Sequence, residues 1–285
     1  MTTTIDKIYA LGPEGTISDT AAQRLNDHLT RAGQIARAEV VYTRTIPEAL
    51  ELAARDANAR AVAPIENSEV GTVVATQDNL AKYGLYIEWE IRVKVRFNIV
   101  SDVPLAEVKR LYAHPVALEQ CNALVARRIP EAESIFTRSN VDSGVRWANE
   151  LPEARSAALV PWDYAPARPA AVVTPDVQND ARNTTRFVVV RGGGGARTHD
   201  FRRAKTSILI EPDADRPGLL FEIVGVFEKY GINLSRIESR PARTGPWAYV
   251  FYMDIANNEK TGDAVSELEA GPWRAIVLGT YDVLS

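Results

Sequence analysis

The sequence predicts an α/β protein with a two-lobed first part, followed by a smaller domain in the ferredoxin-like order βαββαβ. The length of 285 residues suits two domains. Strand-like and helix-like segments alternate before residue 192, four glycines occupy positions 192–195, and the pattern changes after them. Because glycine runs are costly to order, we expect a linker at 192–204 between domains 1–191 and 205–285.

The first part opens with a βαβα pattern, which predicts a largely parallel sheet covered by helices. The expected elements are a strand at 7–12, a helix at 18–29, a strand at 38–43, a helix at 46–56 and a strand at 59–66. A second lobe should lie at roughly 85–165, with strands in 86–101, a strand ending near 114, a helix at 117–129 and a strand at 155–161. Two such lobes would leave a cleft between them.

The last part predicts an antiparallel sheet with two helices on one face. The expected elements are a strand at 205–212, a helix at 217–231, hairpin strands at 232–241 and 247–255, a helix at 261–271 and a strand at 274–283. Pro217 and Gly231 sit at the ends of the first helix, and Leu220, Val224 and Phe227 share one face of it. The free edges of such a sheet can pair with a second copy.

The composition excludes several classes of protein. With 33 basic and 37 acidic residues, the net charge of −4 argues against a general nucleic-acid binder but allows a local cationic pocket. The single cysteine, Cys121, excludes an intrachain disulfide, and the spacing of the three histidines predicts no metal site. We expect a soluble cytoplasmic protein, because no apolar run is long enough for a membrane span and the start lacks the features of a secretory signal.

Polar residues cluster in four stretches of the first part: 11–18 (LGPEGTIS), 64–73 (PIENSEVGTV), 112–121 (YAHPVALEQC) and 183–187 (NTTRF). The first places Thr16 and Ser18 at a helix start, where backbone N–H groups suit an anion; a plain N-cap turn is the alternative. The second puts neutral polar groups at a strand end, the usual ligand edge of an α/β sheet, although a polar turn is also possible. His114 in the third stretch could be an acid or base, but we favour a structural role.

The fourth stretch, immediately before a strand, carries Thr184, Thr185 and Arg186. Because side chains alternate along a strand, Thr185 and Arg186 should not face the same spot. Taken singly, each of the four stretches also fits an ordinary loop.

Together, the four stretches resemble the prephenate dehydratase family in order and spacing. The family pattern is Gly-Pro-x-Gly-Thr-Phe-Ser, Pro-Ile-Glu-Asn-Ser-x-Glu-Gly-Ser, His-Pro-x-Ala-Leu-x-Gln-Cys and Asn-x-Thr-Arg-Phe. Four departures are Ile17 for Phe, Val70 for Glu, Thr72 for Ser and Asn179 for a usual Asp, and residues 139–145 also fit poorly. The resemblance implies decarboxylative dehydration of prephenate to phenylpyruvate in phenylalanine biosynthesis, by a hydro-lyase that needs no metal or other cofactor. No long helical extension precedes Ile8, so we expect no fused chorismate mutase.

The resemblance also implies residue roles. Thr185 takes the place of the essential threonine, as a hydroxyl donor to the departing oxygen. Arg186 would offset substrate charge, and Ile17 and Val70 could alter substrate range or rate. The residues expected to bind substrate are Thr16, Ser18, Asn67, Ser68, Gly71, Thr72, Asn183, Arg186 and Phe187.

The last part resembles the ACT regulatory domain of the same enzymes, through Pro217–Leu220 and the run Glu238-Ser239-Arg240-Pro241. This implies L-phenylalanine as allosteric effector and a homo-oligomer, dimer or tetramer, formed through ACT domains. The expected effector residues are Gly218, Leu219, Leu220, Asn233, Leu234, Glu238, Ser239, Arg240 and Pro241. Two alternatives remain: a prephenate decarboxylase that keeps the hydroxide, and a non-catalytic amino-acid sensor, since periplasmic binding proteins share the two-lobed architecture.

Overall fold

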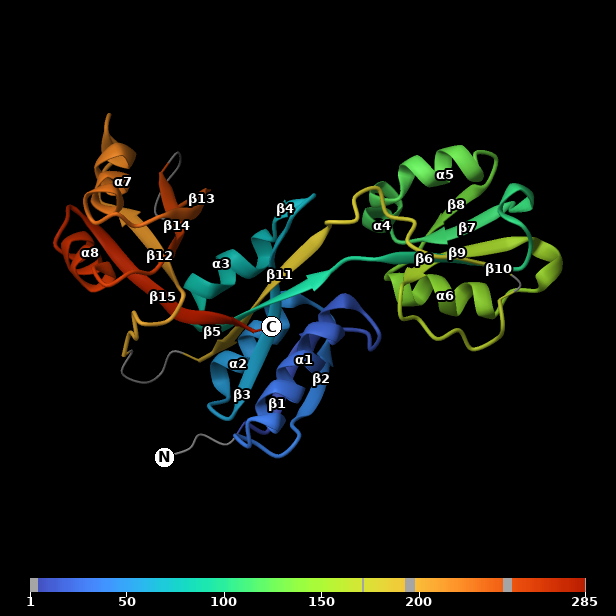
Figure 1. Cartoon of the computed structure of the whole chain (residues 1–285), viewed down its shortest axis with the longest axis horizontal. Coiled ribbons are helices and arrows are strands. Elements are labelled where there is room, and N and C mark those ends of the chain that lie inside the picture. Colours follow the sequence, from blue (N-terminus) through green and yellow to red (C-terminus); the bar gives the residue numbers. More distant parts are fainter. Residues whose placement is uncertain (1–4, 171, 193–197, 243–247, 285) are drawn as a thin grey trace.

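The computed structural model describes residues 5–170, 172–192, 198–242 and 248–284. The last domain, the first lobe and the second lobe lie in a row, with the first lobe in the middle (Figure 1). The strands of the larger sheet are β1 (Lys7–Leu11), β2 (Glu39–Thr43), β3 (Ala59–Asn67), β4 (Gly71–Thr72), β5 (Tyr86–Lys94), β11 (Thr184–Arg191), β12 (Lys205–Pro212), β13 (Leu234–Pro241), β14 (Tyr249–Ala256) and β15 (Trp273–Leu284). Their order is β13-β14-β12-β15-β5-β11-β3-β1-β2, with β4 paired to β3.

The second lobe has a separate sheet in the order β10-β6-β9-β7-β8. Its strands are β6 (Phe97–Ser101), β7 (Arg110–Ala113), β8 (Glu133–Phe136), β9 (Ser156–Pro161) and β10 (Val172–Thr174). The helices in the described part of the chain are α1 (Ile17–Arg31), α2 (Ile46–Arg55), α3 (Val74–Lys82), α4 (Pro115–Gln120), α5 (Asn122–Arg128), α6 (Asn140–Ala148), α7 (Leu219–Lys229) and α8 (Thr261–Glu269), with short 3₁₀ turns at Leu105–Glu107 and Pro152–Ala154. No helix in the described ranges is long and apolar enough to cross a membrane.

The chain passes between the lobes twice, once from β5 to β6 and once on its return into β11. The two crossing segments touch, because Val95 N donates to Asn183 O at 2.8 Å. Since β5 belongs to the first sheet and β10 to the second, the second lobe spans about Phe97–Thr174 rather than the expected 85–165. The residues that begin β11 therefore lie where the first lobe meets its connection to the second.

The first lobe is less parallel than the sequence suggested. β1 pairs in parallel with β2 and β3, but β11 runs antiparallel to both β3 and β5. The reason is the path of the chain: it leaves the first lobe along β5 and returns beside it along β11. Strands that leave and return side by side must be antiparallel.

The last domain has the expected βαββαβ order, and α7 and α8 pack on one face of its sheet around Ile223, Phe227 and Met253. Of the expected helix face, Phe227 is buried and Val224 partly buried, but Leu220 is exposed, and the buried face extends to Leu219, Ile223 and Val226. The cause is that this helix is apolar on nearly every side, so its sequence does not distinguish the buried face.

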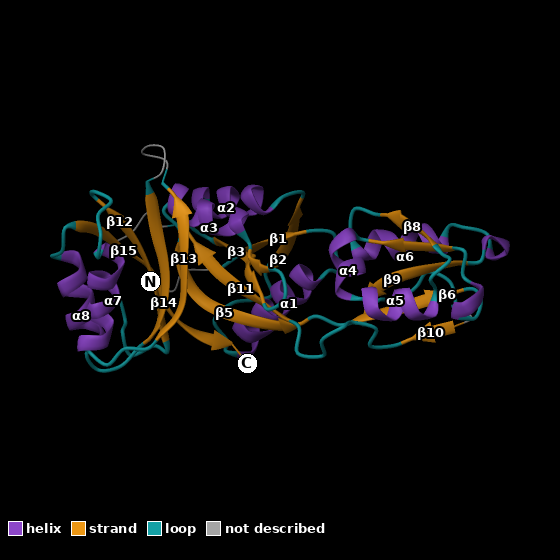
Figure 2. Cartoon of the chain, turned by 90° about the horizontal axis from the view of Figure 1, so that it is seen from above, coloured by secondary structure: helices purple, strands orange, loops and turns teal. Residues whose placement is uncertain are grey.

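The two sheets of the first lobe and the last domain are joined. β15 pairs in parallel with β5, so one continuous sheet runs from β13 to β2 (Figure 2). Gly193–Gly195 of the expected linker, and Trp247 at the expected start of a hairpin strand, lie outside the described residues. Pairing of β15 with β5 ties the last domain to the first lobe independently of that linker.

The expected helix at 117–129 is divided at Cys121 into α4 and α5. Asn179 stabilises the break, because its backbone N donates to Gln120 O at 2.7 Å and its side-chain oxygen accepts from Ala123 N at 3.2 Å. The poorly matching stretch 139–145 forms the start of α6, where Ser139 acts as N-cap and accepts from Asp142 N.

Candidate active site

The centre of the candidate site is a pair of facing residues, Thr185 on β11 and Asn67 on β3, in register with each other. Asn67 Nδ2 donates to Thr185 Oγ1 at 2.9 Å and to Asn183 Oδ1 at 2.8 Å. Its Oδ1 accepts from the backbone N atoms of Glu69 and Val70, both at 3.0 Å, which fixes the orientation of the amide. Thr185 is an acceptor in its bond to Asn67, so its own proton is available to another oxygen.

This arrangement changes the expected role of Asn67. A carboxamide has two N–H donors and one oxygen with two acceptor positions, and Asn67 uses all four within the protein. It therefore holds the Thr185 hydroxyl and has no hydrogen-bonding position left for a substrate. Asn183, fully buried and expected to bind substrate, accepts from Asn67 through its side-chain oxygen, while its Nδ2 has no hydrogen-bond partner among the described residues.

The turn between β3 and β4 is tied to the start of β11. Ser68 N donates to Thr184 O at 3.0 Å, and Thr184 N donates to Ser68 Oγ at 3.0 Å. Gly71, paired with Asn67, has a φ of +86°, a conformation that favours glycine. Hence Ser68 and Gly71 shape the strand end that carries Asn67.

The Gly12–Ser18 loop lies at the same end of the sheet, because β1 and β3 are parallel and this loop follows β1. Thr16 caps α1: its Oγ1 accepts from Asp19 N at 3.4 Å and donates to Pro13 O at 2.9 Å. Ser18 is buried in the first turn. Ile17 packs against the hydrophobic clusters of both lobes, so the loop lies at the boundary between them.

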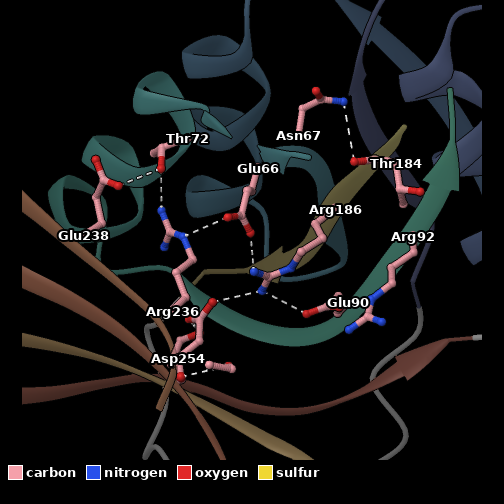
Figure 3. A network of polar contacts seen from close by, with 12 residues as sticks. Glu66, Asn67, Thr72, Glu90, Arg92, Thr184, Arg186, Arg236, Glu238 and Asp254 are labelled. Atoms are coloured by element: carbon pink, nitrogen blue, oxygen red, sulfur yellow. Dashed lines mark hydrogen bonds and ion pairs between the residues drawn. The ribbon is translucent and has the colours of Figure 1, made fainter. Parts of the chain in front are cut away.

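Arg186 meets three carboxylates (Figure 3), and because side chains alternate along a strand it faces the opposite side of β11 from Thr185. Its Nη1 lies 2.5 Å from Glu66 Oε2, and its Nη2 lies 3.0 Å from Glu90 Oε2 and 2.9 Å from Asp254 Oδ2. Burial alone would lower the pKa of the guanidinium, but the Asp254 and Glu90 carboxylates outweigh burial and raise that pKa. The implied role of offsetting substrate charge therefore needs revision, because protein carboxylates already neutralise Arg186.

Two other expected substrate residues lie away from Thr185. Thr72 Oγ1 donates to Glu238 Oε2 at 2.9 Å and accepts from Arg236 Nη2 at 2.9 Å, both on β13 of the last domain. Phe187 is buried in the core of the first lobe. Thr72 is thus an interdomain contact and Phe187 a packing residue.

The titratable groups near this end of the sheet have shifted pKa values. Burial lowers the pKa of His114, which favours the neutral form of its imidazole. Burial, reinforced by the charge of Glu69, raises the pKa of the Cys121 thiol to about 12. Burial and the nearby Asp180 raise the pKa of Glu69. Glu69 stands next to Val70, which replaces the carboxylate of the family pattern.

A cavity of about 800 Å³ lies between α3 and the sheet of the last domain. Four expected effector residues line it: Leu219, Ser239, Arg240 and Pro241. Gly218 has a φ of +84° at the start of α7, which favours glycine there. The other expected effector residues are exposed or partly exposed, and Glu238 bonds to Thr72.

Comparison with known proteins decides the family. The family model described as prephenate dehydratase matches residues 8–193, and the ACT domain model matches residues 214–270. The chain belongs to the prephenate dehydratase family. The resemblance carried by the four stretches is therefore confirmed, as is the two-lobed α/β part followed by an ACT domain.

Individual relatives agree with this family. The chain is 32% identical over 277 residues to a prephenate dehydratase of Mycobacterium leprae, covering 93% of this chain and 82% of that one. It is 28% identical to a prephenate dehydratase of Methanocaldococcus jannaschii, covering 97% of each chain. A crystal structure of prephenate dehydratase from Arthrobacter aurescens in complex with L-Phe superposes with a TM-score of 0.79 at 28% identity, covering 97% of this chain and 90% of that one.

Proposed function

We propose that the chain converts prephenate to phenylpyruvate, with Thr185 donating to the departing hydroxyl oxygen. Loss of CO₂ pushes an electron pair into the ring, the C–OH bond breaks, and aromatisation drives the reaction. Threonine is a weak acid, so its contribution is a fixed O–H dipole where negative charge develops. The supporting observation is the Asn67–Thr185 pair, which leaves the threonine proton free to be donated.

Substrate contacts on this side of the sheet would come mainly from neutral groups. The N-terminal N–H groups of α1 suit a carboxylate, since a helix N-terminus favours negative charge, whereas Thr16 Oγ1 is already engaged by Asp19 N and Pro13 O. Ser18 in the first turn of α1 and Ser68 directly after β3 also carry hydroxyls. Asn67 and Arg186 would act without contacting substrate, because Asn67 bonds to Thr185 and Arg186 pairs with three carboxylates.

The decisive experiment is incubation of the pure full-length chain with prephenate, followed by the ultraviolet spectrum of the product. Formation of an aromatic keto acid is expected. A non-aromatic keto acid would favour the decarboxylase alternative, and unchanged prephenate would favour the sensor alternative.

We further propose that L-phenylalanine binds the ACT domain and inhibits. The 800 Å³ cavity supports this, because Arg240 offers a cation for a carboxylate, Asp213 offers an anion for an ammonium group, and Leu219 and Phe251 offer apolar surface. Isothermal titration should give saturable heat with L-phenylalanine and none with L-alanine at the same concentration. No heat with L-phenylalanine, together with unchanged turnover, would contradict this role.

A homo-oligomer through ACT domains is also proposed. Phe221 on α7 is 78% exposed and Ile237 on the edge strand β13 is 42% exposed, and such apolar surface is typical of an interface. Sedimentation of the full chain at micromolar concentration should give a mass above 31.4 kDa. We place the enzyme in the cytoplasm, because its one cysteine is a free thiol, which suits a reducing compartment.

A further inference from the structure

We infer that the ACT domain contributes a positioning residue to the basal reaction: Asp254 on β14, which acts through Arg186 on the strand that carries Thr185. This role depends on the proposed role of Thr185. It differs from effector binding, because Asp254 and Arg186 are not among the residues that line the cavity proposed for the effector.

Arg186 joins the two domains through buried charges. Asp254, 5% exposed, places Oδ2 2.9 Å from Arg186 Nη2. Its Oδ1 accepts from Ser207 Oγ on β12 at 2.6 Å, so the carboxylate is held on one side by the ACT sheet and on the other by Arg186. Glu90 on β5, fully buried, binds the same Nη2 of Arg186 and also Lys205 Nζ at 2.8 Å. The guanidinium therefore has little freedom to move.

Arg186 is coupled to Thr185 by strand geometry. The two strands β3 and β11 form consecutive facing pairs, Asn67 with Thr185 and Glu66 with Arg186, and the register shifts immediately after them. Because alternate residues face opposite sides, the Glu66–Arg186 pair faces the ACT domain while the Asn67–Thr185 pair faces away. On its other edge, this end of β11 pairs with β5 in unbroken register from Thr184 to Val189, so the backbone of Thr185 and Arg186 is held on both edges and moves as one unit. A shift of Arg186 therefore moves the backbone that sets the position of Thr185.

A second ACT strand supports the same two-strand end. Arg236 on β13 places Nε 3.8 Å from Glu66 Oε1, and its Nη2 donates to Thr72 Oγ1 at 2.9 Å. Thr72 in turn faces Glu66 in the β3–β4 pairing. The ACT sheet thus contacts the end of β3 through Arg236 and the start of β11 through Asp254 (Figure 3).

Sequence patterns gave no sign of this contact, because Asp254 lies within a strand of the ACT domain and outside every recognised motif. Glu90 is equally inconspicuous in the sequence. Their meeting with Arg186 results from the β15–β5 pairing, which brings the two sheets together. Asp254→Asn leaves Arg186 with two carboxylates, so the buried cation stays paired and the chain is expected to fold.

The test compares the full-length Asp254→Asn variant with wild type in steady-state turnover of prephenate, well below the melting temperature of either. The expected result is a kcat about tenfold lower with KM changed less than about twofold, because misplacement of a reacting group by about 1 Å can cost as much as 10²-fold. The matched control is Asp102→Asn in the second lobe. The side chain of Asp102 is also only 4% exposed and pairs with an arginine, Arg168, at 2.7 Å, and its side-chain partners among the described residues all lie in the second lobe. This control should lose stability while keeping kcat within about twofold.

Three outcomes overturn this role. They are a kcat of Asp254→Asn within twofold of wild type, an equal fall of kcat in the Asp102→Asn control, and a loss of kcat in Asp254→Asn that matches the fraction of unfolded protein. In the Thr185→Ala background, Asp254→Asn should change the residual turnover less than twofold, since its effect passes through Thr185. If Asp254→Asn does not fold, Ser207→Ala, which removes the bond that orients Asp254, should lower kcat about threefold, and an unchanged kcat refutes the role. An inert wild type overturns the proposed function as well, whereas an active wild type with an insensitive variant overturns only the role of Asp254.

Discussion

Removal of the Thr185 hydroxyl is the sharpest perturbation of the candidate site. In Thr185→Ala, Asn67 Nδ2 loses an acceptor at 2.9 Å but keeps Asn183 Oδ1 at 2.8 Å. Loss of one hydrogen bond with a small void costs about 1–2 kcal/mol, which is small against the roughly 5–15 kcal/mol of a typical domain. The variant should therefore fold, and its crystal structure or melting curve should stay close to wild type.

The expected catalytic loss is much larger than the structural one. A positioned hydroxyl that donates to a departing oxygen contributes about 10²–10⁴-fold, so kcat should fall by that factor while KM stays within a few-fold. The assay is the initial rate of aromatic keto acid formation across a range of prephenate concentrations. Thr185→Ser, which keeps an O–H group, should retain turnover within about tenfold of wild type.

The neighbouring threonine provides a matched control. Thr184 Oγ1 donates to Arg182 O at 2.8 Å, and its side chain alternates with that of Thr185, so Thr184→Ala should keep kcat within about twofold. A Thr185→Ala enzyme that turns over within a few-fold of wild type would refute the role of this hydroxyl. Equal losses in Thr184→Ala and Thr185→Ala would show that the strand, and not the hydroxyl, is responsible.

The remaining predictions concern three other side chains. Asn67→Asp replaces the donor to Thr185 with an acceptor, so the threonine proton turns toward the carboxylate and kcat should fall about 10²-fold. A rise in KM with kcat unchanged would contradict this and would show that Asn67 binds substrate. Because burial raises the pKa of Cys121 to about 12, the native thiol at pH 8 should resist iodoacetamide while the guanidinium-unfolded chain reacts, as mass spectrometry can measure; fast native labelling would contradict its burial. Burial would raise the pKa of Glu90, but Arg186 and Lys205 outweigh burial and lower that pKa. The contribution of ionised Glu90 to the free energy of unfolding is therefore complete above the ordinary pKa of 4.5, and it is lost as the pH falls through the lowered pKa of the folded state. The melting temperature should therefore fall on acidification below pH 4.5, with a flatter slope in Glu90→Gln, and an equal slope in both proteins would contradict this assignment.

The sequence determined the features that depend on local pattern. The spacing of apolar residues and the residue types at helix and strand ends located most helices and strands. The βαββαβ order after residue 205 predicted the arrangement of the last domain. Motif spacing identified the family and singled out Thr185. Alternation along a strand predicted that Thr185 and Arg186 face different sides, because side-chain direction follows from backbone geometry alone.

Only the tertiary structure decided what those side chains meet. Asn67 and Thr185 are 118 residues apart in the chain, and the register of β3 on β11 brings them together. Arg186 has a motif position that suggests substrate binding, yet the β15–β5 pairing brings Asp254 to it and neutralises its charge. Pairing between distant strands depends on how whole sheets pack, and a buried cation takes whichever carboxylates that packing places beside it. Neither the pairing of distant strands nor the set of carboxylates around the cation can be read from the local sequence.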